Sequence, residues 1–441
     1  MTKNIIFPWM LFFISFINYV ISINSLASSA LNFWCFGWLI FISIFIYRDK
    51  KIGWLFFLYL FGLTASLASC LIIEETQYYL TEIESYGFLT GATSRSSSLG
   101  SIFIVSVYIF FGLFQKIYSG RLCFIAELKD WEDKLLKLAL IFITMYLYFS
   151  LFQSPPPIFS NLSRFNYFQD GALPGYRFFY TLIPFSSLIL SSSYLQGRIS
   201  KKTIIFWVIA MIGIMLLTNE KFSLYVDTFY YLITPFIIWG KITIDRKFHV
   251  MLGAFLLFLI SLVLVSYLRR GEELSYLFSR IALQGQMIFA LDLISLQREG
   301  FDFDLLSNSF LGFSSNSGDI GMYHLMHLIA PTNVVDEMIS TNMSFTAPFP
   351  SSFSYFFTNY YAPIAIILFA VPVSYSIFVF YKTLLSSSLF NIFIAATLFH
   401  YLSIATFMGK TERLVHPITI SAFLITVTLL VCGFLKKSGN S

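Results

Sequence analysis

The sequence predicts an all-α polytopic integral membrane protein with about 12 transmembrane helices and one large outer, periplasmic loop. Hydrophobic residues make up 57% of the 441 residues, charged residues make up 12%, and the mean hydropathy is +0.76. So few charges cannot cover the surface of a water-soluble globule of this length. The apolar residues also gather in runs long enough to cross the hydrocarbon core of a bilayer.

These apolar runs of about 17 to 22 residues follow one another along the chain. Each is predicted to be a helix, because a helix satisfies its own backbone hydrogen bonds in lipid, whereas a barrel would show shorter alternating segments. In order, the runs are 5–23, 30–47, 53–73, 99–115, 135–152, 175–195, 203–218, 222–240, 248–268, 360–381, 388–408 and 416–435.

The runs divide the chain into three predicted parts. Residues 1–268 hold nine transmembrane helices with short loops, 269–359 form the large periplasmic loop, and 360–441 hold three helices and a cytoplasmic tail. The four cysteines are scattered without a pair or a CxxC spacing, which predicts neither a disulfide framework nor a cysteine-ligated metal. No phosphate-cradling glycine-rich loop occurs on the inner side, so we expect no nucleotide cofactor, and nothing predicts a nucleic-acid partner.

The distribution of Lys and Arg orients the chain. With the N-terminus inside, 18 of the 28 cations fall on the cytoplasmic side. The other ten, the outer cations, are Arg95, Arg164, Arg177, Lys221, Arg269, Arg270, Arg280, Arg298, Lys410 and Arg413. Topology disfavours cations in short outer segments, so we expect Arg164, Arg177 and Lys221 to serve another purpose there.

The third outer segment runs from Gln153 to Gly175, and its Pro155-Pro156-Pro157 ends the preceding span. Arg164 is followed ten residues later by Gly175. Arg177 falls at the mouth of the next span, where a guanidinium either faces a cavity or anchors the helix end at the headgroups.

Two charged residues flank the next outer turn. Lys221 begins a predicted helix at the same outer surface, and Asp227 lies within that apolar run. A carboxylate inside a span is costly unless it is paired or faces water. Asp227 is therefore interpreted either as half of a structural pair or as a group that orients a substrate hydroxyl or a cation.

The large loop opens with Arg269-Arg270 and continues as an amphipathic segment with Arg280 and Gln284 together on one face. Its apolar positions at helical spacing are Leu274, Leu277, Phe278, Ile281, Ile288 and Leu291. A Gly/Ser/Asn-rich break over 307–318 follows, and then a short helix with His324 and His327.

This architecture resembles the Wzy-type O-antigen or oligosaccharide repeat-unit polymerases. The shared features are twelve spans with both ends inside, one large late outer loop, a smaller third outer loop with Arg164 and Gly175 ten residues apart, and outer arginines in both loops. The arginines of the large loop lack that glycine spacing, since Arg280 is followed at eleven residues by Leu291.

The resemblance implies an enzyme of the bacterial inner membrane, a glycosyltransferase that polymerises undecaprenyl-diphosphate-linked oligosaccharide repeat units for O-antigen or capsule. Its expected partners are that lipid-linked oligosaccharide, membrane lipid and a chain-length regulator protein. The leaving group is a lipid diphosphate, and a guanidinium meets phosphate oxygens in pairs. The expected diphosphate- and glycan-binding residues are Arg164, Gly175, Arg177, Lys221, Arg269, Arg270 and Arg280.

A general base must take the proton of the acceptor hydroxyl. His324 and His327, three residues apart with Asp319 before them, are the best-placed titratable pair of the large loop, and the three are the expected catalytic residues. The same spacing also fits solvent-facing or packed side chains, or two ligands of a zinc ion that would need further ligands. We expect no metal.

Short acidic pairs occur as Asp302-Phe303-Asp304 and Glu82-Ile83-Glu84, the second of them in an outer loop. They are similar to the pairs with which some glycosyltransferases hold a metal. Both are short enough to arise by coincidence.

Other functions compete with polymerisation. A ligase that moves finished polysaccharide from the lipid diphosphate to lipid A core needs the same cations and a base, and only its acceptor differs. A flippase or exporter would show repeated halves and charges strung through many spans, which this chain lacks. A membrane protein without activity would not need ten outer cations.

The orientation is testable with reporter fusions. Fusions after Lys51, Lys202 and Lys247 should report the cytoplasm, and fusions near Asn161 and Ser315 should report the outer side, because the cations set the orientation. A cytoplasmic signal at Ser315 would overturn the assignment of the large loop to the outer face.

Overall fold

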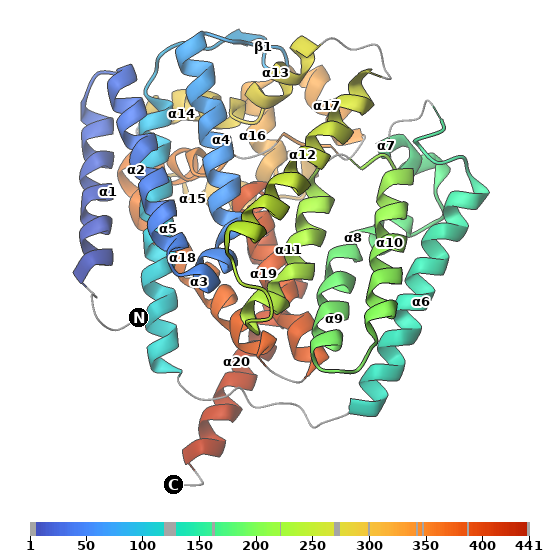
Figure 1. Cartoon of the computed structure of the whole chain (residues 1–441). Coiled ribbons are helices and arrows are strands. Elements are labelled where there is room, and N and C mark those ends of the chain that lie inside the picture. Colours follow the sequence, from blue (N-terminus) through green and yellow to red (C-terminus); the bar gives the residue numbers. More distant parts are fainter. Residues whose placement is uncertain are drawn as a thin grey trace. The chain divides into compact units, whose positions relative to one another are not determined.

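The protein is helical almost throughout. The computed structural model describes residues 6–118, 129–160, 164–220, 222–268, 274–298, 300–340, 343–345, 348–385 and 388–438 (Figure 1). It is 79% helical. Within the described ranges the strands are one antiparallel pair, β1 (Tyr79–Leu80) and β2 (Ser85–Tyr86). The prediction of an all-α protein is confirmed.

Eight candidate spans among the described residues are long and apolar enough to cross a membrane, which makes the chain a multi-pass membrane protein. Seven are the helices α1 (Ile6–Asn24), α2 (Ser29–Tyr47), α4 (Phe57–Thr76), α5 (Ala92–Ile117), α12 (Arg246–Leu268), α18 (Ser351–Leu384) and α19 (Leu389–Phe407). The eighth, Thr411–Cys432, covers the 3₁₀ turn η4 (Thr411–Leu414) and most of α20 (Pro417–Ser438).

Four of the twelve predicted runs are not among these eight. They coincide with α6 (Lys129–Gln153), with the pair α8 (Tyr176–Thr181) and α9 (Ile183–Leu195), with α10 (Lys201–Leu217) and with α11 (Ser223–Ile238). Every predicted run therefore contains helix. The number twelve itself stays a prediction.

The chain folds into two compact units. The first unit comprises residues 1–121, 275–379 and 397–427, and the second comprises 122–274, 380–396 and 428–441. The second unit contains α6 and α8 to α12, together with the short α7 (Arg164–Asn166) and the π-turn η1 (Tyr167–Gly171). In it, α9 packs along α11.

The first unit is built around α5, against which α1, α2 and α4 all pack. The first half of α5 is rich in serine, and every residue from Ala92 to Val107 is buried. Small side chains let neighbouring helices approach closely, which is how helices associate in lipid. At Gly100, for example, an added Cβ would lie 2.9 Å from Leu63 of α4.

A buried carboxylate caps α5. Glu74, 2% exposed at the end of α4, accepts hydrogen bonds from the backbone N–H groups of Gly91, Ala92 and Thr93 at 2.7 to 3.1 Å. Asn32 of α2 donates to the same carboxylate at 3.1 Å and accepts from Ser94 N. A helix N-terminus presents unpaired N–H groups and a positive dipole end, so Glu74 satisfies both.

One turn into α5, Arg95 forms an ion pair with Asp292 of α14 (Gln286–Leu296). Arg95 Nε lies 3.0 Å and Nη2 2.5 Å from the carboxylate, and the two side chains are 5% and 1% exposed. Arg95 Nη2 also donates to Thr90 O at 2.8 Å. Neither charge is left alone in the interior, which is the condition for burying both.

The amphipathic segment of the large loop is two helices, α13 (Leu274–Ala282) and α14, separated at residues 283–285. The predicted single apolar face is wrong: Phe278 and Ile281 are exposed, whereas Ile288 and Leu291 are buried in α14. A Cβ at Gly285 would clash with the backbone of Cys70. This close approach to α4 fixes where α14 begins.

The buried pair predicts a large loss of stability on substitution. Asp292→Asn should lower the free energy of unfolding by about 3–5 kcal/mol, because it leaves Arg95 buried without its counter-charge. Arg280→Gln is the matched control, since Arg280 pairs with Glu82 but is 43% exposed, and it should cost about 1 kcal/mol or less. Thermal unfolding in detergent measures both, and equal losses would contradict the structural role of the Arg95–Asp292 pair.

Candidate functional site

The start of the helix that carries the two predicted histidines packs closely against the segment around Gly409 and Glu412. α16 (Gly321–Ile329) starts at Gly321, whose φ of +51° favours glycine, and an added Cβ there would clash with the Glu412 carboxylate. A Cβ at Gly409 would clash with Pro348. In Figure 1, α16 lies with α13, α14 and α17 (Thr332–Ser340) towards the end of the first unit that carries β1.

His324 contacts a tyrosine of α18. Its Nε2 lies 3.2 Å from the Tyr355 hydroxyl, and its ring also lies 6.1 Å, centroid to centroid, from Phe356. The imidazole is half-buried and Tyr355 is buried. When Nε2 is unprotonated, the Tyr355 hydroxyl donates to it.

A guanidinium completes this cluster. Arg298 Nη1 donates to the backbone carbonyl of Tyr355 at 2.7 Å, and the guanidinium carbon lies 4.8 Å from the centre of the Tyr355 ring. A cation over an aromatic face is attracted by the ring. We call Arg298, His324 and Tyr355 the His324 cluster.

The cluster lies next to a break in α18. Thr358 has φ 59° and ψ 160°, an unusual conformation for a β-branched residue, and it divides the helix. Pro363 has no N–H with which to bond the carbonyl of Asn359, four residues earlier. The hydroxyl of Tyr19 in α1 donates to that carbonyl at 2.7 Å, and Asn359 Nδ2 donates to Ser295 O at 3.3 Å. Strained backbone held by its surroundings is typical of functional sites.

The surroundings of His324 favour the neutral imidazole. Burial lowers its pKa below the ordinary value of 6.5, and the positive charges of His327 and Arg298 act in the same direction. The Asp319 carboxylate opposes them by raising the pKa. An unprotonated imidazole is the form that accepts a proton.

The other two predicted catalytic residues lie nearby but in open positions. Asp319 ends the 3₁₀ turn η3 (Ser317–Asp319) and is exposed, and His327 is exposed on the last turn of α16. A Cβ at Gly318 would lie 3.5 Å from His327 Nε2. The structure thus brings the three predicted residues into one region, in which His324 alone is partly enclosed.

Arg280 and Glu82, one member of the acidic pair between α4 and α5, meet at a second polar site in the first unit. Arg280 Nη1 lies 3.2 Å from Glu82 Oε1, and Gln286 Nε2 donates to the other oxygen of Glu82 at 2.5 Å. The carboxylate of Glu82 is therefore engaged by protein groups. Asp302 is engaged as well, because it caps α15 (Phe303–Leu305) through Asp304 N and Leu305 N.

In the second unit, Arg164 forms an ion pair with Glu220. The Glu220 carboxylate is 3% exposed and also accepts from the Tyr180 hydroxyl at 3.0 Å. Gly175, with φ +83°, begins α8, the helix that carries Tyr180. Glu220 thus receives one contact from Arg164 and another from Tyr180 of the helix that follows Gly175.

Two other charged side chains of the second unit lie apart from this ion pair. Arg177 is exposed on α8. Asp227 makes no hydrogen bond or ion pair with another described residue, so no structural partner is seen for it there. The predicted binding residues Lys221, Arg269 and Arg270 lie outside the described residues.

Three contributors were not singled out from the sequence. Arg298 appears there only as one of ten outer cations, and Tyr355 and Glu220 are not named as site residues. The position of Arg298 shortly before the acidic pair Asp302 and Asp304 is only a weak indication of a site residue. Tyr355 and Glu220 carry no local signal, because their partners lie 31 and 56 residues away along the chain.

The comparisons with known proteins are sparse. Residues 315–425 match a family of unknown function (DUF6418). The matched stretch is a minority of the chain and contains His324 and Tyr355 but not Arg298. The curated proteins contain no match to this chain, and neither do the solved structures.

The His324 cluster predicts a depressed imidazole pKa. In a histidine NMR titration of the folded protein, with His324→Gln to assign the resonance, His324 should be half-protonated below pH 6.5, because burial disfavours the cation. Asp319→Asn should lower that pH further, since it removes the charge that favours protonation, and His327→Gln should raise it. A midpoint at or above 6.5 would contradict the argument.

Proposed function

We propose that this chain is a Wzy-type polymerase that joins undecaprenyl-diphosphate-linked oligosaccharide repeat units at the periplasmic face of the bacterial inner membrane. The observation that carries the proposal is the His324 cluster, in which an imidazole favoured in its neutral form lies beside a guanidinium. Glycosyl transfer from a lipid diphosphate needs both a proton acceptor and a cation.

In the proposed reaction, the acceptor sugar hydroxyl attacks the anomeric carbon of the donor glycan. A new C–O bond forms, the bond between the anomeric carbon and the diphosphate oxygen breaks, and the electron pair of that bond leaves with the lipid diphosphate. The hydroxyl proton passes to His324 Nε2, either directly or through the Tyr355 hydroxyl, which lies 3.2 Å from it. No nucleotide is consumed, because the sugar–diphosphate bond supplies the energy.

We assign stabilisation of the departing diphosphate to Arg298 first. Its guanidinium is held by the Tyr355 carbonyl and ring, so it is oriented before substrate arrives. Arg280 is 43% exposed, and we propose that it contacts a second diphosphate or the glycan. Arg95 is excluded from substrate binding, since its guanidinium is buried against Asp292.

In the second unit we assign Arg164 a glycan- or phosphate-binding role, with Glu220 and Tyr180 as positioning residues. The proposal includes twelve spans with both ends in the cytoplasm, the 269–359 loop on the outer side, and a chain-length regulator as partner. A polymerase binds two lipid-linked substrates, so cations in two outer segments are consistent with it.

Deletion of the gene tests the activity. The deletion strain should keep lipid A core carrying a single repeat unit, because a separate ligase still attaches what the missing polymerase fails to extend. Loss of every attached unit, with long lipid-linked polymer in the membrane, would show that the chain is a ligase. Gel separation of the lipopolysaccharide and of the lipid-linked glycan distinguishes the two outcomes.

Complementation of the same strain tests the residues. Arg164→Lys, Arg280→Lys and Arg298→Lys keep the charge but lose the bidentate fork, so polymer should shorten or disappear at normal protein level. His324→Gln should reduce polymer about 10²-fold or more if it removes the base. Lys116→Gln, at the predicted inner end of α5, is the matched control and should support full-length polymer. Full-length polymer from all of the arginine variants would refute paired phosphate recognition.

A further inference from the structure

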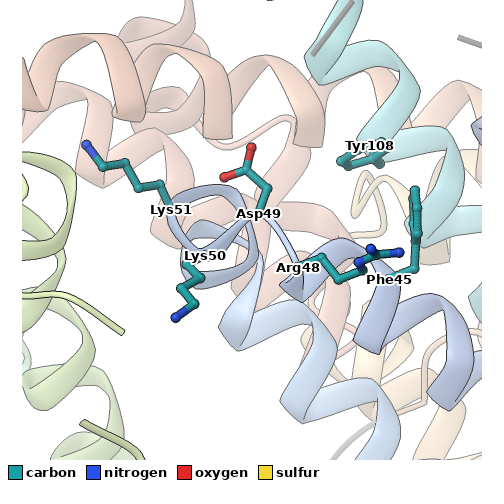
Figure 2. A pocket seen from close by; sticks show the side chains of 6 residues that line it. All are labelled: Phe45, Arg48, Asp49, Lys50, Lys51 and Tyr108. Atoms are coloured by element: carbon teal, nitrogen blue, oxygen red, sulfur yellow. The ribbon is translucent and has the colours of Figure 1, made fainter. Parts of the chain in front are cut away.

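A basic pocket lies at the other end of α2 and α5 from the Arg95–Asp292 pair. It is lined by Phe45, Arg48, Asp49, Lys50, Lys51 and Tyr108, and has a volume of about 630 Å³ (Figure 2). Tyr108 is thirteen residues beyond Arg95 on α5, or roughly 20 Å at 1.5 Å per residue. The pocket is thus far from Arg95 along the helix, near the opposite surface of a bilayer.

The backbone that carries these cations is held in place. The three cations of the pocket lie where α2 turns into α3 (Lys50–Leu55), and Ile52, Gly53, Trp54 and Leu55 of that short helix are buried. A Cβ at Gly53 would lie 2.6 Å from the Cα of Tyr47, so the turn folds closely onto the end of α2. The cations therefore project from a packed turn.

The charge of the pocket is positive. The lining contains three cations and one carboxylate, and Asp49 uses that carboxylate to cap α3 by accepting from Ile52 N at 3.3 Å. Arg48 is exposed, and its guanidinium makes no hydrogen bond or ion pair with the part of the chain that the structure describes. A guanidinium of this kind is available to a phosphate.

The pocket combines cations with two aromatic rings, a combination that fits the surface of a membrane. Figure 2 shows Arg48 directed towards Phe45, whereas Lys50 and Lys51 point away from it around the short helix. The Phe45 and Tyr108 rings pack edge to face with their centroids 6.1 Å apart. Tyrosine rings such as that of Tyr108 are enriched at the level of the lipid headgroups.

We propose that this pocket binds the headgroup of an anionic phospholipid. Diverging cations do not enclose a small free anion, but they do present positive charge to a headgroup that the bilayer already holds at the surface, where basic residues attract anionic lipid. The positive-inside rule accounts for cations at this end of the spans, but it does not require a pocket with an aromatic wall among them. The site is independent of the proposed glycosyl transfer.

The test uses purified full-length protein in nanodiscs of phosphatidylcholine alone or of phosphatidylcholine with phosphatidylglycerol. Phosphatidylglycerol should raise the Tm of the wild type, and native mass spectrometry should retain it on the protein. The variant with Arg48, Lys50 and Lys51 all changed to Gln should lose both effects, with retention falling about fivefold per cation removed. The matched control changes Arg198, Lys201 and Lys202 to Gln at another predicted inner turn, and it should behave as the wild type.

Two controls check the folding and the topology of the variants. Arg48→Gln alone should weaken retention if the triple variant does not fold, and a reporter fused after Lys247 should show that the topology is unchanged. Equal loss in the control triple variant would show a general charge effect and overturn the proposal. Equal stabilisation by inorganic phosphate in phosphatidylcholine nanodiscs would identify a small-anion site and overturn the lipid assignment.

Discussion

The first unit depends on carboxylates buried at the start of α5. Glu74 occupies the helix N-terminus, Asp292 neutralises Arg95 one turn later, and Asn32 connects α2 to both Glu74 and Ser94. Two carboxylates and one guanidinium would leave a net negative charge, which the positive end of the α5 dipole offsets. Because α2, α4, α5 and α14 each contribute at least one partner, this network sets the relative positions of these four helices.

The sequence predicted the helices well and their breaks poorly. Apolar length places a helix in every predicted run, because backbone hydrogen bonds in lipid must be satisfied locally. The split between α13 and α14 depends on the contact of Gly285 with Cys70, and the break at Thr358 depends on partners from α1 and α14. Such breaks are determined by distant segments, so a local periodicity cannot reveal them.

The sequence indicates which types of residue form the candidate site, but it does not indicate which of them are buried or paired. His324 stands out in the sequence because residues 269–359 contain only two histidines, and its exposed neighbours His327 and Asp319 look equivalent to it there. His324 differs from the other two in being partly buried, and burial depends on the tertiary structure, which the local sequence does not reveal. Arg95 cannot be told from the other predicted outer cations by counting charges. In the structure it is buried, because it pairs with Asp292, which lies 197 residues away along the chain.

The hydrogen bond from Tyr19 to Asn359 joins residues separated by 340 positions. Synthesis at 5–20 residues per second delivers Asn359 to the membrane on the order of tens of seconds after Tyr19. Over most of that interval Arg95 also waits for Asp292, so a costly charge resides in or beside the nascent bundle without its final counter-ion. The early helices must therefore be accommodated by the insertion machinery, by water or by provisional partners until α14 and α18 arrive. The contacts that stabilise the first helices thus form only after the later helices have been synthesised.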